Sequence, residues 1–106
     1  METSVRVVPL EESLSHYIQE LGNFRWNGKG IPMQMVHPLA NYIVLHTPPG
    51  GFLEAVLRND LHLAVSRADE ENQHILYLYV AVLYNVAPAS CWGSNKNYEE
   101  WAKLAL

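Results

Sequence analysis

Apolar residues recur at helical spacing along most of this chain, and that pattern constrains its fold more than any other feature. The residues from 10 to 21 place their apolar side chains on one face of a helix. The same period continues near 32–45, 52–65 and 70–86. Period-2 alternation is confined to a brief segment near the N-terminus. The sequence therefore predicts an all-α fold, a compact bundle of about five helices within a single domain.

Capping residues predict where the first helix begins and ends. Pro9 suits the first helical position, and Glu11 and Glu12 complement the positive end of the helix dipole. Gly22 follows the last apolar residue and suits a left-handed stop. We therefore expect an amphipathic helix that ends at Gly22.

Three further helix starts depend on short polar side chains. Asn59 or Asp60 is expected to cap a fresh turn after the apolar run that precedes it. Asp69 is expected to cap a helix over residues 70–86, and Ser94 a last short helix near the C-terminus. That last helix carries apolar residues at i and i+3, Trp101 and Leu104, which are expected to dock on the core.

Residues 1–30 are predicted to form an N-terminal extension of the helical core, which comprises residues 31–106. The extension contains one amphipathic helix and a Gly-rich turn at Asn27-Gly28. An Asn-Gly turn fits either a hairpin with a short strand or a mobile linker. Large apolar and cationic side chains crowd around it, so they either cover the bundle, or bind a protein partner, or pair with a second copy in a homodimer. The candidate interface residues are Phe24, Arg25, Trp26, Lys29 and Met33.

Composition excludes several functional classes. A formal net charge of −4, with seven Lys and Arg residues scattered along the chain, argues against direct nucleic-acid binding. The single cysteine excludes an internal disulfide and favours a reducing compartment. We find no signal-peptide pattern and no apolar run of membrane-spanning length. The expected setting is the cytoplasm, with no membrane partner.

No catalytic, metal or cofactor motif stands out from the pattern of residues. The five histidines form no i, i+4 pair, and a zinc site needs several converging ligands. Cys91 would need a histidine nearby to act as a nucleophile. Asp60 and Asp69 could form an acid and base pair, but both stand where helix caps belong. We therefore expect no catalytic residues, no metal and no cofactor, with a small hydrolase as a remote alternative.

A set of polar residues flanks the apolar helical faces in the second half of the chain. These side chains either satisfy buried helix ends or line a pocket for a polar ligand, with two aromatic rings as platforms. Under the pocket hypothesis, the protein binds a nucleotide signal, and the Arg67 side chain faces into the pocket. The residues concerned are Asn59, Asp60, Arg67, Asp69, Asn72, Tyr84, Asn85 and Trp92.

A long gapped pattern runs through the sequence and consists of P-P-G-x-F-L-x-x-V-L-x-N-D-L, A-D-x-x-N, L-Y-N-x-x-P and C-W-G-S, followed by a terminal Trp. This pattern resembles a family of small uncharacterised phage and prophage proteins, and the similarity covers roughly residues 31–104. The matching positions are Pro48, Pro49, Gly50, Phe52, Leu53, Val56, Leu57, Asn59, Asp60, Leu61, Ala68, Asp69, Asn72, Leu83, Tyr84, Asn85, Pro88, Cys91, Trp92, Gly93, Ser94 and Trp101.

The resemblance implies a phage context and a bacterial host cell, but no activity. Small acidic phage proteins often bind and block host machinery. The expected function is therefore a non-enzymatic protein that binds and inhibits a host protein, for example a defence complex such as CRISPR machinery.

Overall fold

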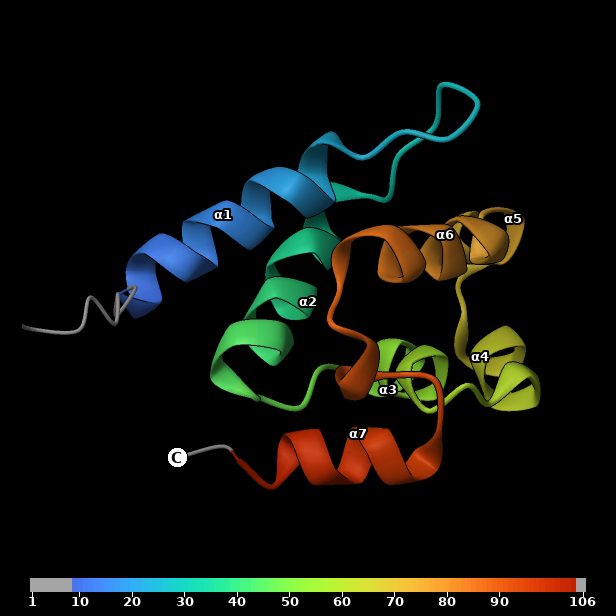
Figure 1. Cartoon of the computed structure of the whole chain (residues 1–106). Helices are drawn as coiled ribbons and strands as arrows, with labels where there is room; N and C mark the ends of the chain where they lie inside the picture. Colours follow the sequence, from blue (N-terminus) through green and yellow to red (C-terminus); the bar gives the residue numbers. More distant parts are fainter. Residues whose placement is uncertain (1–8, 105–106) are drawn as a thin grey trace, which may run out of the picture.

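The computed structural model describes residues 9–104 and confirms the all-α fold class (Figure 1). Over that range the chain forms seven α-helices, one short 3-10 helix and no strand, so the helices are more numerous and shorter than the sequence predicts. No helix of this range is both long and apolar enough to cross a membrane. The elements are α1 (Leu10–Asn23), α2 (Met33–Leu45), α3 (Gly51–Leu57), α4 (Leu61–Arg67), α5 (Glu70–His74), α6 (Leu76–Val86), η1 (Ala89–Cys91) and α7 (Asn95–Ala102).

Helix α1 packs against α2, and it ends later than the sequence predicts. The helix continues through Gly22 to Asn23 and stops at Phe24, which has extended backbone angles. Gly22 is therefore not the left-handed stop that its position indicates. A Cβ at that position would lie 3.6 Å from the Met33 Cε, which is an ordinary van der Waals contact. Neither capping nor close packing therefore explains the glycine at this position.

The segment between α1 and α2 forms a tight turn that projects from the helical body (Figure 1). Trp26 and Lys29 exchange two backbone hydrogen bonds of 2.9 and 3.0 Å. The two residues between them, Asn27 and Gly28, both have positive φ, as a type I′ turn requires. The predicted hairpin turn is present, but the pairing stops at this single bridge. An isolated two-stranded ribbon has too little to pack against to extend further.

The capping residues of the middle helices lie where the sequence predicts. Asp60 accepts a hydrogen bond from the Leu63 amide and begins α4, while Asn59 adopts the left-handed conformation before it. Asp69 accepts from the Asn72 amide and begins α5. Both aspartates are N-caps, which confirms the structural interpretation of these two positions.

The single helix predicted over residues 70–86 is wrong, because the chain breaks at Ile75 into α5 and α6. Ile75 has φ −121° and ψ 22°, outside helical geometry. No glycine or proline marks the break in the sequence. The bend places the buried Asn72 where its side-chain oxygen accepts a hydrogen bond from the Tyr79 hydroxyl.

Helix α7 closes the fold against α2 and α3. Its start at Ser94 is confirmed, since the Ser94 hydroxyl accepts from the Asn97 amide. Trp101 is half-buried and packs against the core, as expected. Leu104 does not dock: 59% of it is exposed, because α7 ends at Ala102. The core that these helices enclose includes the fully buried residues Leu21, Val36, Leu39, Tyr42, Leu57, Leu78, Tyr79, Val82 and Leu83.

Candidate functional site

Helix α6 is apolar on all sides, although one side of it faces water. Its sequence, LYLYVAVLYNV, contains no charged residue. A helix of this kind normally lies wholly within a core. Here Leu78, Tyr79, Val82 and Leu83 are buried, whereas three large side chains are exposed. At about 100° per residue, those three fall within roughly 60° of one another on the opposite side. They are Tyr77, Val80 and Tyr84.

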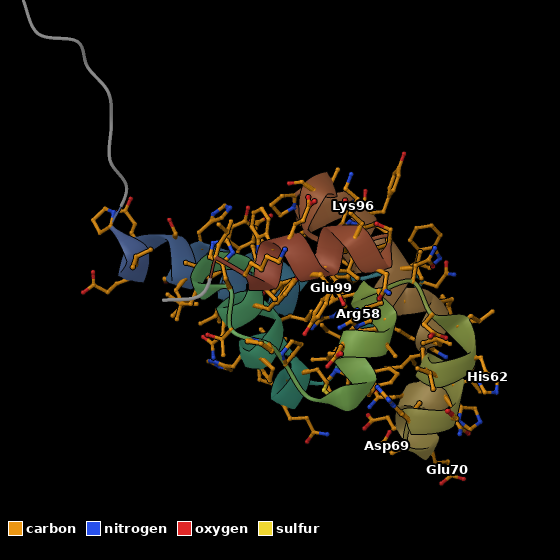
Figure 2. The ribbon with its side chains drawn as sticks, turned by 90° about the horizontal axis from the view of Figure 1, so that it is seen from below. Arg58, His62, Asp69, Glu70, Lys96 and Glu99 are labelled. Atoms are coloured by element: carbon orange, nitrogen blue, oxygen red, sulfur yellow. The ribbon has the colours of Figure 1, made fainter. Side chains whose placement is uncertain are left out.

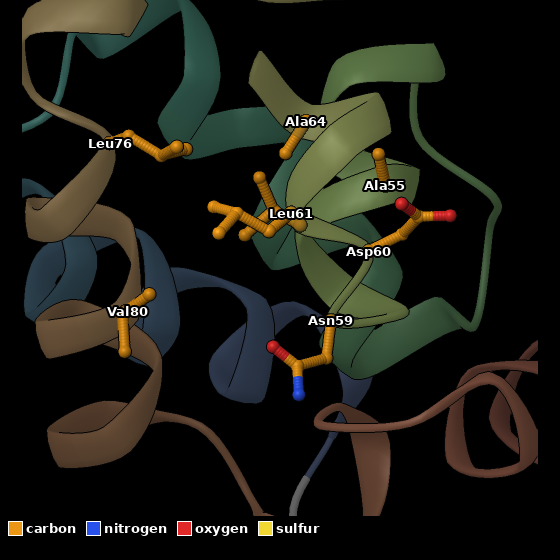
Figure 3. Close-up of a pocket in the computed structure, with 8 residues that line it drawn as sticks. Ala55, Asn59, Asp60, Leu61, Ala64, Leu76 and Val80 are labelled. Atoms are coloured by element: carbon orange, nitrogen blue, oxygen red, sulfur yellow. The ribbon is translucent and has the colours of Figure 1, made fainter. Parts of the chain in front are cut away.

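Helix α4 adds two exposed aliphatic residues, of which Leu61 lines one hollow together with Val80 of α6. Leu61 is 69% exposed, and Val65 lies one turn further along and is 45% exposed. Figure 3 shows Leu61 between α4 and the α6 residues Leu76 and Val80. We call the five exposed residues together the α4–α6 face: Leu61, Val65, Tyr77, Val80 and Tyr84.

A small apolar hollow lies within the α4–α6 face (Figure 3). Its volume is about 40 Å³, which accommodates a side chain but not a typical metabolite, since ligand pockets commonly occupy about 300–1,000 Å³. Helices α3, α4 and α6 all contribute to its wall. The lining residues are Ala55, Val56, Asn59, Asp60, Leu61, Ala64, Leu76 and Val80.

The structure does not gather the predicted polar set into one pocket. Asn59 and Asp60 border the apolar hollow, whereas Tyr84 is 80% exposed on α6. Asn85 bonds back to the Ala81 carbonyl of its own helix at 2.8 Å. Arg67 donates to the Gly51 carbonyl at 3.1 Å and so ties α4 to the start of α3.

The remaining members of that polar set stabilise backbone and core. Asp69 caps α5, and the carbonyl of the half-buried Trp92 accepts a hydrogen bond from the Asn97 side chain. Asn72 is almost fully buried, and its amide nitrogen has no partner among the described residues. Burial, followed by the charges of Asp69 and Glu71, raises the pKa of the Tyr79 hydroxyl that donates to Asn72. These contacts fit a structural network at helix ends.

The predicted interface residues around the turn divide into two groups. Phe24 is half-buried and packs against the core, and the Arg25 guanidinium donates to the carbonyls of Gly22 and Phe24. Trp26, Lys29 and Met33 are exposed. The turn therefore presents an aromatic ring and a cation to solvent, and the start of α2 presents a thioether, whereas Phe24 packs on the core.

A charged cluster joins α3 to α7, on the side seen in Figure 2. Arg58 forms ion pairs with Glu54 at 2.9 Å and Glu99 at 3.1 Å, donates to the Asn95 side chain, and lies 4.3 Å from the centre of the Tyr98 ring. A shallow depression of about 470 Å³ lies beside it. Because both carboxylates already neutralise Arg58, this depression has little attraction for an anion.

The groups considered for catalysis are poorly placed to react. Cys91 is fully buried, and burial raises its pKa to about 12, so the reactive thiolate is scarce at neutral pH. Asp60 and Asp69 serve as helix caps. Among residues 9–104, no group of three or more His, Cys, Asp or Glu side chains could hold a metal ion.

The α4–α6 face was not among the sites that the sequence predicts. Of its five residues, only Tyr84 is in the predicted pocket set. The available signal was the absence of any charge in residues 76–86, which a helical pattern alone assigns to the core. Comparison with protein-family models, curated proteins and solved structures finds no match for this chain.

Proposed function

We propose that this chain is a non-enzymatic binding protein that docks on a host protein through the α4–α6 face. The observation that carries the proposal is an uncharged helix with Tyr77, Val80 and Tyr84 turned to water. Exposed apolar patches on small proteins commonly mark interaction sites. Tyrosines are also common anchors of protein interfaces, because they bury a large ring and keep a polar tip.

The resemblance to phage and prophage proteins directs the proposal to a bacterial partner. In that context, binding inhibits the host protein, and a defence complex such as CRISPR machinery is the class to test first. The acidic composition suits such a partner, because machinery that handles nucleic acid commonly presents a basic surface.

Small-ligand binding is the second candidate, and the geometry favours it less. A nucleotide binder needs a cation that faces into a pocket, yet Arg67 donates to a backbone carbonyl on the surface. Arg58 is paired with two carboxylates. The hollow of the α4–α6 face, at about 40 Å³, is also too small for a nucleotide.

The test compares one substitution on the face with a matched substitution elsewhere. Val80→Asp places a charge at the centre of the α4–α6 face, and Leu10→Asp places the same charge on exposed α1. Leu10 is 58% exposed and Val80 is 49% exposed at the edge of the hollow, so both variants should stay folded, and thermal melts of both check this before capture is compared. Each is used to capture partners from a lysate of the bacterial host, followed by mass spectrometry.

We expect a stoichiometric protein that the parent and Leu10→Asp retain and Val80→Asp loses. Equal retention by both variants would place the contact elsewhere, with the exposed Trp26 turn as the next surface to test. A stoichiometric small molecule without a protein partner would support the second candidate instead.

A further inference from the structure

We propose that Asn27 is a site of spontaneous covalent modification, at which its side-chain amide becomes a carboxylate through a cyclic imide formed with Gly28. The site lies in the projecting turn between α1 and α2 (Figure 1). It is therefore independent of the α4–α6 face and of any partner that binds there.

The reacting groups are open to water. Asn27 and Gly28 are both exposed, and apart from its chain neighbours nothing lies within 4 Å of the position that a Cβ on Gly28 would occupy. The bridge between Trp26 and Lys29 uses neither the Gly28 amide nor the Asn27 side chain, and neither of these has a hydrogen-bond partner among residues 9–104. The attacking nitrogen and the side-chain carbon that it attacks are thus free to meet.

Asn27 already has one of the two backbone angles that ring closure requires. Its φ is 53°. Type I′ and type II′ turns share a φ of about 60° at this residue, and a flip of the next peptide plane, from a ψ of about 30° to about −120°, converts the first into the second. After the flip, the Gly28 nitrogen lies on the same side as the Asn27 Cβ, as in a five-membered imide ring. Both turns close a two-residue hairpin loop, and glycine adopts either sign of φ, so the flip leaves the Trp26–Lys29 bridge in place.

The reaction exchanges ammonia for water and needs no oxidant or cofactor. The Gly28 nitrogen loses its proton to hydroxide and attacks the Asn27 Cγ. The Cγ–Nδ2 bond breaks, and Nδ2 takes a proton from water and leaves as ammonia. Water then opens the imide at either carbonyl. Opening at Cγ gives an aspartate at position 27, and opening at the main-chain carbonyl gives an isoaspartate whose chain runs through Cβ.

Both products change the surface of the turn. Residues 22–33 contain two cations, Arg25 and Lys29, and no acidic residue, so the new carboxylate lowers a positive charge that nothing in this segment opposes. The isoaspartate also lengthens the main chain inside a two-residue loop, whose geometry depends on its length. The surface around Trp26 and Lys29 therefore changes as the protein ages.

Asn59 supplies a control within the same chain. It is exposed and has a φ of 62°, as Asn27 does. However, the next amide nitrogen, that of Asp60, donates to the Ala55 carbonyl at 2.9 Å, and Asp60 caps α4. A flip of the peptide after Asn59 would break these contacts, so Asn59 should keep its amide.

The experiment follows both asparagines in the full chain over weeks, at neutral and at mildly alkaline pH. Brief digestion at mildly acidic pH, with cleavage after Arg and Lys, releases residues 26–29 and 59–67 as separate peptides. Mass spectrometry measures conversion of amide to acid in each peptide, and an isoaspartate-specific methyltransferase labels the rearranged product. A parallel sample is kept unfolded in urea.

In the folded chain, Asn27 should convert at least about tenfold faster than Asn59, because a hydrogen bond and a helix cap hold the peptide after Asn59. The rate at Asn27 should rise with pH, since hydroxide generates the nucleophile. Unfolding should bring the two rates closer by speeding Asn59. Equal rates in the folded chain, or an Asn27 that converts only after unfolding, would overturn the proposal.

Asn27→Gly is the matched variant. Glycine keeps the positive φ of the turn and has no amide to lose. The mass change in residues 26–29 and the isoaspartate label should both disappear in this variant. An isoaspartate label that persists at the parent level would place the modification at another residue and would also overturn the proposal.

Discussion

The junction between α2 and α7 and the α4–α6 face are both built from apolar and aromatic side chains, yet only the first is closed. At the junction, the Tyr42 hydroxyl donates to the Cys91 carbonyl at 2.7 Å, and the Trp101 indole donates to the Tyr42 carbonyl at 3.0 Å. The His46 ring lies against Trp101 and hydrogen-bonds its carbonyl at 2.9 Å. Every one of these polar atoms has a partner within the chain.

The α4–α6 face contains tyrosines without such partners. Among residues 9–104, neither the Tyr77 nor the Tyr84 hydroxyl forms a hydrogen bond. Their polar atoms depend on water or on another molecule. The two regions are similar in apolar content and differ in hydrogen bonding. Polar atoms of the α2–α7 junction are hydrogen-bonded within the chain, whereas the tyrosine hydroxyls of the α4–α6 face are available to water or to a partner.

The largest expected effect comes from two tyrosines of the same helix. Tyr79→Ala removes a buried ring and leaves the buried Asn72 oxygen without a donor, so it should lower the free energy of unfolding by about 3 to 5 kcal/mol. Tyr84→Ala should change it by less than about 0.5 kcal/mol, because the ring is 80% exposed. Urea unfolding of both variants measures the difference. A comparable loss in the two would contradict the distinction between core and face.

The projecting turn offers a second, smaller contrast. Phe24→Ala should lower the free energy of unfolding by about 1.5 kcal/mol, since its half-buried ring packs on the core. Trp26→Ala should stay within about 0.5 kcal/mol of the parent, because Trp26 is exposed. Thermal and urea melts of the single variants compare them. If Trp26→Ala lost more free energy of unfolding than Phe24→Ala, the Trp26 ring would pack on the core, and the turn would no longer be a candidate binding surface.

The closed junction also predicts a pH dependence through Cys91. The folded protein keeps this thiol protonated to about pH 12, whereas the unfolded chain releases the proton near its ordinary pKa of 9.0. Rising pH therefore favours the unfolded chain, and the thiol should lower the free energy of unfolding by about 1.4 kcal/mol per pH unit between these values.

Cys91→Ala supplies the control for this slope. Burial also raises the pKa of the Tyr79 hydroxyl, which affects the parent and the variant alike. The pKa of the Tyr42 hydroxyl is raised by burial and, to a lesser extent, by the charge of Cys91, so the comparison reports the thiol together with this coupling. Urea unfolding of both from neutral pH to about pH 11 should show a shallower decline for Cys91→Ala. Parallel declines would show that water already reaches the thiol in the folded state.

Local signals in the sequence predicted much of this fold. Asp60, Asp69 and Ser94 cap helices where their side chains favour it. Asn27-Gly28 forms the tight turn that these two residues favour. Each depends on hydrogen bonds within a few residues, so a short window of sequence contains the relevant information.

Tertiary contacts decided the rest, because they join residues that are distant in sequence. Arg58 of the α3 end reaches Glu99 on α7, and the Trp101 indole donates to the Tyr42 carbonyl of α2. The exposure of the α4–α6 face also depends on how separate helices pack together. An apolar pattern identifies residues that avoid water but does not say which side of a helix its neighbours leave uncovered. Sequence alone thus determined the all-α class and the caps at Asp60, Asp69 and Ser94, and only the packing of α3, α4 and α6 left Val80 and Tyr84 facing solvent.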